Sequence, residues 1–325
     1  MKRLLIFFFF VLSALGGIVK AQINLNDSIV QVVSYWSVGD KYEFKSNITK
    51  YKIVGTDTTV VFKSSMPFSI EVVDSTANNY VIKIMEGETQ YDVMDEDTQM
   101  TIESGVTEVS KGHPLLLKMS SLGAVEDVEN ASECMEVLNK MADLTVKYMQ
   151  KKFMADSTLT AEGRQAMLFT IKTVSDKLRS PQMLTAAVAP YMRLFAIFGK
   201  QYEMNKEYEA TDQAETAFAP GQPIDFTSTF WVKNVYPEEN SAVFANNVVY
   251  DSDQVLKAYL SICKEAIPEA EQYANSPDSP YIFLNEYTGW SIHVGAGWPL
   301  YYYQEIESRQ GKEATISVTE IELIL

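Results

Sequence analysis

Four residues of this 325-residue chain are best suited to nucleophilic or metal chemistry: the histidines His113 and His293 and the cysteines Cys134 and Cys263. A Ser-His-Asp triad would need one of the two histidines. His113 lies in a Lys-Gly-His-Pro turn and His293 alternates with apolar residues, so both are expected to be ordinary loop and strand residues. The sequence lacks the zinc-protease, nucleophile-elbow, phosphate-loop and Cys-x-x-Cys spacings. It therefore predicts no catalytic residues, no metal site and no cofactor.

Carboxylates are abundant, with 43 Asp and Glu against 27 Lys and Arg. The run Asp92–Asp97 could offer oxygen ligands to calcium, but it lacks the alternating acids and central glycine of a hand-type loop, which favours a solvated acidic turn. A glycan hydrolase needs two carboxylates across a cleft, and sequence spacing does not exclude such a pair. The net charge of −16 argues against binding to nucleic acid or anionic lipid headgroups.

The first residues have the pattern of an export signal. A basic start is followed by an apolar run from Leu4 to Val19 and by a small residue, Ala21, after which we expect the cut. The apolar run is short for a membrane span, and no later segment is apolar enough to be one. We expect an exported protein, periplasmic or extracellular, with no transmembrane segment once residues 1–21 are removed.

Export also bears on the two cysteines, because compartments outside the cytoplasm are oxidising. Cys134 and Cys263 each lie on the apolar face of a predicted helix, and we expect both helices to cover the same face of a sheet. The pair is therefore a disulfide candidate. The alternative, two separate buried thiols, stays open.

Further along, the stretch Gly39–Glu86 alternates apolar and polar residues in several runs, which predicts strands with one apolar face each. The alternation changes parity between Ile48 and Tyr51, which predicts a bulge. Turn-forming residues at 74–79 join two runs as a hairpin. From 89 to 109 the pattern weakens, and we expect short strands with acidic turns. The apolar face of such a meander needs a second layer.

Residues 130–204 supply candidates for that layer, because their apolar residues recur at three- and four-residue spacing, as in amphipathic helices. The third predicted helix starts with Ser180 as N-cap and Pro181 at its first position, and Pro190 is expected to kink it. Strand patterns then return. We divide the chain into a signal peptide (1–21), an N-terminal β meander (22–129), a helical insert (130–204) and a C-terminal β half with one helix (205–325), the two β parts forming one continuous sheet.

Four short segments mark the order of these elements along the chain: Gly39–Phe44, Lys111–Leu115, Leu122–Gly123 and Gly297–Leu300. Together with the export signal, this order resembles that of uncharacterised exported proteins of Gram-negative bacteria. The order is also similar to the half-open barrels of periplasmic lipoprotein carriers. That resemblance implies a curved antiparallel sheet, covered by helices, that holds acyl chains. It transfers no functional residue to this chain.

We therefore predict an α+β fold: a curved antiparallel sheet or open β-barrel, with helices from 130–198 and 252–267 against its concave side. A cavity between sheet and helices predicts binding of an apolar small molecule, lipid or acyl chain, or of a protein partner in the cell envelope. The residues expected to line it are Met141, Leu144, Tyr148, Ile171, Leu184 and Phe195. Two alternatives remain: a structural or partner-binding surface protein with a filled core, and a carboxylate-dependent glycan hydrolase.

Overall fold

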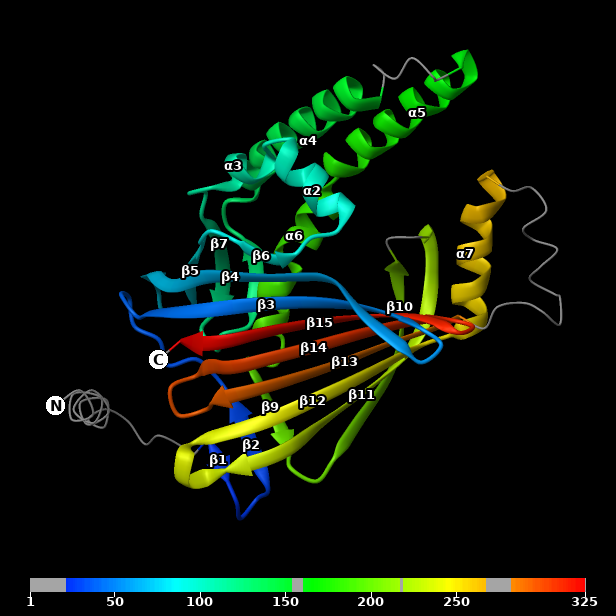
Figure 1. Ribbon diagram of the computed structural model, residues 1–325. Helices are drawn as coiled ribbons and strands as arrows, with labels where there is room; N and C mark the ends of the chain where they lie inside the picture. The colour runs from blue at the N-terminus through cyan, green and yellow to red at the C-terminus, as the bar shows by residue number, and fades with distance from the viewer. Residues whose placement is uncertain (1–21, 154–159, 217–218, 267–281, 325) are drawn as a thin grey trace.

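The computed structural model describes residues 22–153, 160–216, 219–266 and 282–324 (Figure 1). The expected signal segment, residues 1–21, lies outside these ranges. Twelve strands of the described residues form one antiparallel sheet in the order β10-β11-β12-β13-β14-β15-β3-β4-β5-β7-β8, with β6 paired to β4. Its strands are β3 (Lys41–Val54), β4 (Asp57–Ser75), β5 (Asn79–Glu86), β6 (Gln90–Val93), β7 (Leu115–Ser120), β8 (Val125–Val128), β10 (Glu207–Thr216), β11 (Ala219–Tyr236), β12 (Ser241–Tyr250), β13 (Ile282–His293), β14 (Trp298–Gln310) and β15 (Glu313–Ile324).

The sheet joins the two ends of the chain. β15 pairs with β3 along its whole length, so the last strand of the chain lies beside the first long one. The outermost strands, β10 and β8, do not pair with each other, and the sheet is not closed. The fold is therefore α+β with a large open antiparallel sheet, as the sequence predicted.

Alternating residues explain the N-terminal strands. β3 and β4 shift register between Lys50 and Tyr51, where the change of parity predicted a bulge. The predicted hairpin is present: β4 ends at Ser75 and β5 begins at Asn79, and the Thr76 hydroxyl accepts the backbone N–H of Asn78 and of Asn79. These local hydrogen bonds are those expected of a turn rich in Ser, Thr and Asn.

The prediction of short strands for segment 89–109 was mostly wrong. Only β6 is a strand, and it is followed by α2 (Glu96–Glu103) and α3 (Val106–Ser110). Asp95 is the N-cap of α2, because its carboxylate accepts the backbone N–H of Thr98 at 2.8 Å. An acid in this position stabilises a helix start, so part of the acidic run begins a helix.

The main core lies on one face of the sheet. Five buried residues lie directly opposite one another on the neighbouring strands β11 to β15: Val232, Phe244, Trp290, Tyr302 and Ile321. Residues paired across a ladder share a face, so these side chains form one apolar row. The cover comes from α6 (Pro181–Leu194) and from a small sheet of β1 (Ile23–Asn24), β2 (Ile29–Val32) and β9 (Lys200–Glu203), whose residues belong to the same buried cluster.

The other helices occupy different places. α4 (Ala131–Phe153) and α5 (Ala161–Leu178) pack against each other and extend away from the sheet (Figure 1). α7 (Ser252–Ala266) packs on β11 and β13, where Val255 and Ala258 join Ile224 and Ile282 in a separate small cluster. The expectation that all helices of 130–198 cover the sheet is therefore corrected: α6 does so, whereas α4 and α5 mainly cover each other. Of the helices described, none combines the length and apolar character that crossing a bilayer requires.

Candidate binding pocket

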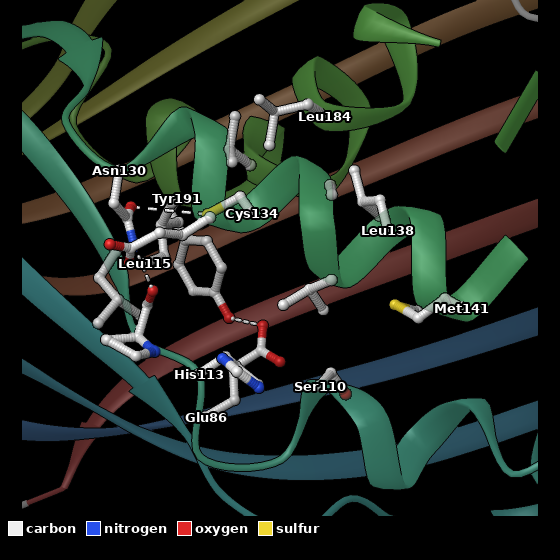
Figure 2. A pocket seen from close by; sticks show the side chains of 16 residues that line it. Glu86, Ser110, His113, Leu115, Asn130, Cys134, Leu138, Met141, Leu184 and Tyr191 are labelled. Atoms are coloured by element: carbon white, nitrogen blue, oxygen red, sulfur yellow. Dashed lines mark hydrogen bonds between the residues drawn. The ribbon is translucent and has the colours of Figure 1, made fainter. Parts of the chain in front are cut away.

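A pocket of about 230 Å³ lies where α4 and α6 meet the end of β5 and the segment 110–115 (Figure 2). Its wall is mainly apolar and includes Leu115, Val137, Leu138, Met141, Leu184 and Val188. Leu138 and Val188 are buried, whereas Glu86, Glu133 and Ala187 are exposed. The pocket therefore runs from a solvent-facing mouth inward to apolar side chains.

Two helical stripes form the apolar wall. On α4, Cys134, Val137, Leu138 and Met141 follow one another at three- and four-residue steps, and Leu184, Ala187, Val188 and Tyr191 do the same on α6. Residues with this spacing share one helix face, so each helix presents a continuous stripe to the pocket. α6 begins as predicted, with the Ser180 hydroxyl accepting the Met183 N–H and Pro181 at the first position. Pro190 lies inside this helix without dividing it.

Asn130 fixes the walls relative to one another. Its side-chain oxygen accepts the Leu116 N–H at 2.9 Å, and its amide nitrogen donates to the Pro114 carbonyl at 2.8 Å. Its own carbonyl accepts the N–H of Cys134 in the first turn of α4. Because Asn130 is buried and these bonds satisfy its amide, it holds β7 and α4 together and has a structural role.

The polar side of the pocket is built around Glu86 and Tyr191. The Tyr191 hydroxyl donates to Glu86 Oε1 at 2.5 Å, although the two residues are 105 positions apart (Figure 2). Burial, together with the nearby Glu86 charge, raises the pKa of Tyr191 well above its usual value. Tyr191 therefore keeps its proton and acts as a hydrogen-bond donor to the carboxylate. His113 lines the same pocket as Glu86.

Cys134 lies on the α4 wall as a free thiol. The side chain of Cys263 lies outside the described part of α7. α4 packs against α3, α5 and α6, whereas α7 packs against β11 and β13, so the expectation that both helices cover one sheet face is corrected. The candidate disulfide is thus not formed at Cys134 in this structure.

We expect Cys134 to react several times more slowly with a disulfide reagent such as DTNB than free cysteine does at pH 7.5. Burial, and then the charge of Glu133, raise the pKa of its thiol, and the thiolate is the reactive form. The rate should rise as the pH is raised further. The measurement uses a Cys263→Ser protein, so that only Cys134 reports. A rate equal to that of free cysteine at pH 7.5 would contradict a raised thiol pKa at Cys134.

The six residues expected to line a cavity fall into two groups. Met141 and Leu184 line this pocket. The other four lie elsewhere: Phe195 and Ile171 are buried in other contacts, Tyr148 donates its hydroxyl hydrogen bond to Glu103, and Leu144 is half-buried on α4 away from the pocket. Sequence reasoning missed Glu86 and His113 as site residues, since neither the end of a strand nor a Gly-His-Pro turn indicates a pocket.

Among known proteins, no protein-family profile matches this chain, and no curated protein does. Among solved structures, one of lipovitellin, titled for lipid–protein interactions, aligns with a TM-score of 0.36 and 9% identity over 89% of this chain. This chain spans 25% of that lipovitellin chain. A loop-deletion mutant of OmpT, an outer membrane protein of Vibrio cholerae, aligns with a TM-score of 0.19 and 7% identity over 89% of this chain and 100% of its own. These similarities carry no functional argument.

Proposed function

We propose that the protein binds a small apolar ligand in the pocket between α4 and α6. The observation that carries this proposal is the pair of apolar helix stripes facing one pocket, with a few polar groups gathered on one side. An apolar lining with a small number of placed polar groups is the usual composition of a ligand site. The hydrogen bonds of Asn130 join the start of α4 to the segment 114–116, and the hydrogen bond between Tyr191 and Glu86 joins α6 to β5.

The volume of the pocket limits the size of the ligand. An apolar cavity of about 150 Å³ in another protein binds benzene. A pocket of about 230 Å³ can therefore hold a ring or a short chain, and it is smaller than the roughly 300 Å³ at which drug-sized sites begin. A full acyl chain would extend from the mouth near Ala187. The proposal is thus a ligand with a compact apolar part.

Location is a further part of the proposal. The basic start and short apolar run at the N-terminus support export to the periplasm or the cell exterior. The measurement that tests it is the N-terminal sequence of the protein purified from its host. A chain that starts at Gln22 supports cleavage after Ala21, and one that starts at Met1 contradicts it.

One observation favours partner binding as a second candidate. On α5, Phe169 has 69% of its surface exposed and Leu168 has 49%. Large apolar side chains side by side in water are a feature of interaction surfaces. For the hydrolase alternative, three aspartates line a second pocket, but hydrogen bonds from Gln254 and Gln213 lower the pKa of Asp225, which is opposite to the shift that a glycosidase general acid needs.

We expect straight-chain alcohols to bind the pocket with an affinity that grows about fourfold per methylene, because each buried CH₂ contributes about 0.8 kcal/mol. The gain should stop once the pocket is full. Ala187→Phe, which places a ring in the mouth, should weaken 1-octanol binding at least about tenfold. Isothermal titration calorimetry measures the affinity of each alcohol for the unmodified protein and the affinity of 1-octanol for the variant.

The matched control is Ala186→Phe. Ala186 is exposed on the same helix and does not line the pocket, so this substitution should leave binding within about twofold. Equal effects of the two substitutions, or no binding of any alcohol to the unmodified protein, would overturn the proposed function.

A further inference from the structure

Resting on the proposed function, we infer that the ligand of this pocket carries a positively charged amine beside its apolar part. The inference concerns the chemistry around Glu86 and Tyr191. It distinguishes an amine from the two other head groups that an apolar chain commonly bears, a hydroxyl and a carboxylate.

The charges that line the pocket favour a cation. Glu86 and Glu133 contribute two carboxylates, and in the described part of the chain none of the sixteen lining residues is Lys or Arg. Lys111, two positions before His113, does not line the pocket and is paired with Glu108 at 3.3 Å. An anionic ligand would therefore meet two like charges without a cationic side chain to compensate them.

The hydrogen-bond donors of the site are already engaged. The Tyr191 hydroxyl donates to Glu86, the Ser110 hydroxyl donates to the Thr107 carbonyl at 3.2 Å, and the Cys134 thiol donates to Asn130. A carboxylate head group needs donors, and apart from His113 these groups offer none. The site is therefore poorly suited to a fatty acid.

Acceptors, in contrast, are available. Glu86 Oε2 has no hydrogen-bond partner among the described residues, and Tyr191 holds the other oxygen in place. The Tyr191 and Ser110 oxygens keep lone pairs, and Figure 2 places Ser110 and His113 on the same side of the pocket as Glu86. An ammonium group has three donors and no acceptor, which matches this set. Because Glu86 is exposed at the mouth, the ammonium group need not lose all of its water.

The test compares n-octylamine, 1-octanol and sodium octanoate, which share the same alkyl chain length, by isothermal titration calorimetry at pH 7. We expect octylamine to bind about tenfold more tightly than octanol, because a hydrogen bond to a charged group is stronger than a neutral one. Octanoate should bind most weakly. Glu86→Gln should remove the amine preference, so that the ratio of the octylamine affinity to the octanol affinity falls from about ten to about one. This variant keeps an acceptor for Tyr191, so the pocket stays intact.

Glu88→Gln is the matched control. Glu88 is an exposed carboxylate two residues away that does not line this pocket, so the amine preference should survive its loss. Octanol or octanoate binding as tightly as octylamine would overturn the inference while leaving the proposed function standing. So would an amine preference that survives Glu86→Gln. Failure of all three compounds to bind would overturn the proposed function, and the inference with it.

Discussion

Phe195→Ala should lower the free energy of unfolding by about 3–5 kcal/mol. Phe195 follows α6 directly and is 1% exposed, with its ring centre 5.7 Å from Trp36 and 5.4 Å from Phe198. Removing the ring loses its buried area and its contacts with these aromatic neighbours, and it leaves a cavity in a packed core. The measurement is urea unfolding followed by tryptophan fluorescence.

Leu184→Ala is the matched comparison for Phe195→Ala, because it also truncates an apolar side chain of the α6 region. Leu184 lies near the start of α6, at the opposite end of the helix from Phe195, and is half-buried on the wall of the pocket. Its truncation removes fewer contacts and enlarges a space that is already open, so the cost should be about 1–2 kcal/mol. A Phe195→Ala cost no larger than that of Leu184→Ala would contradict the assignment of Phe195 to the main core.

Gly297→Ala should lower the free energy of unfolding by about 2–5 kcal/mol. Gly297 lies in the turn between β13 and β14 with φ +67°, a conformation that costs alanine about 1–2 kcal/mol. An added Cβ would lie 2.3 Å from the Val33 carbonyl oxygen and 2.8 Å from the Ser34 Cα. These are backbone atoms, so no side-chain rotation relieves the overlap, which adds about 1–3 kcal/mol. The Gly297 carbonyl also accepts the buried Trp36 indole N–H at 2.7 Å.

Gly55→Ala separates the cost of the left-handed backbone conformation from the cost of the steric overlap. Gly55 has a similar φ of +64°, but no atom lies within 4 Å of its added Cβ. It should therefore cost only the backbone contribution of about 1–2 kcal/mol. Urea unfolding gives both values, and near-ultraviolet circular dichroism reports whether Trp36 and Trp298, 4.9 Å apart, keep their packing. Equal costs at the two glycines would show that the approach of Gly297 to Val33 is not tight.

Local patterns in the sequence were sufficient wherever neighbouring residues decide the structure. The alternation of Tyr80, Ile82 and Ile84 predicted β5, and three- and four-residue spacing predicted α4 and α6. The prediction of short strands for segment 89–109 was wrong, because its apolar spacing is weak and its acidic run, which includes Asp95, indicates a turn as readily as a helix start. The bond from Thr98 N–H to Asp95 that begins α2 is local, and the Asp-x-x-Thr spacing was the available signal.

By itself the sequence determined the alternating strands, the helical stripes and the acidic surface, because each depends on contacts between residues a few positions apart or on composition alone. The tertiary structure decided which stripe meets which surface. Met141 and Phe195 belong to equally apolar helical patterns, yet one lines a pocket and the other fills the core. The pair of Glu86 and Tyr191 likewise joins residues 105 positions apart. Such contacts depend on the packing of α6 against the sheet and α4, and no local spacing encodes that packing.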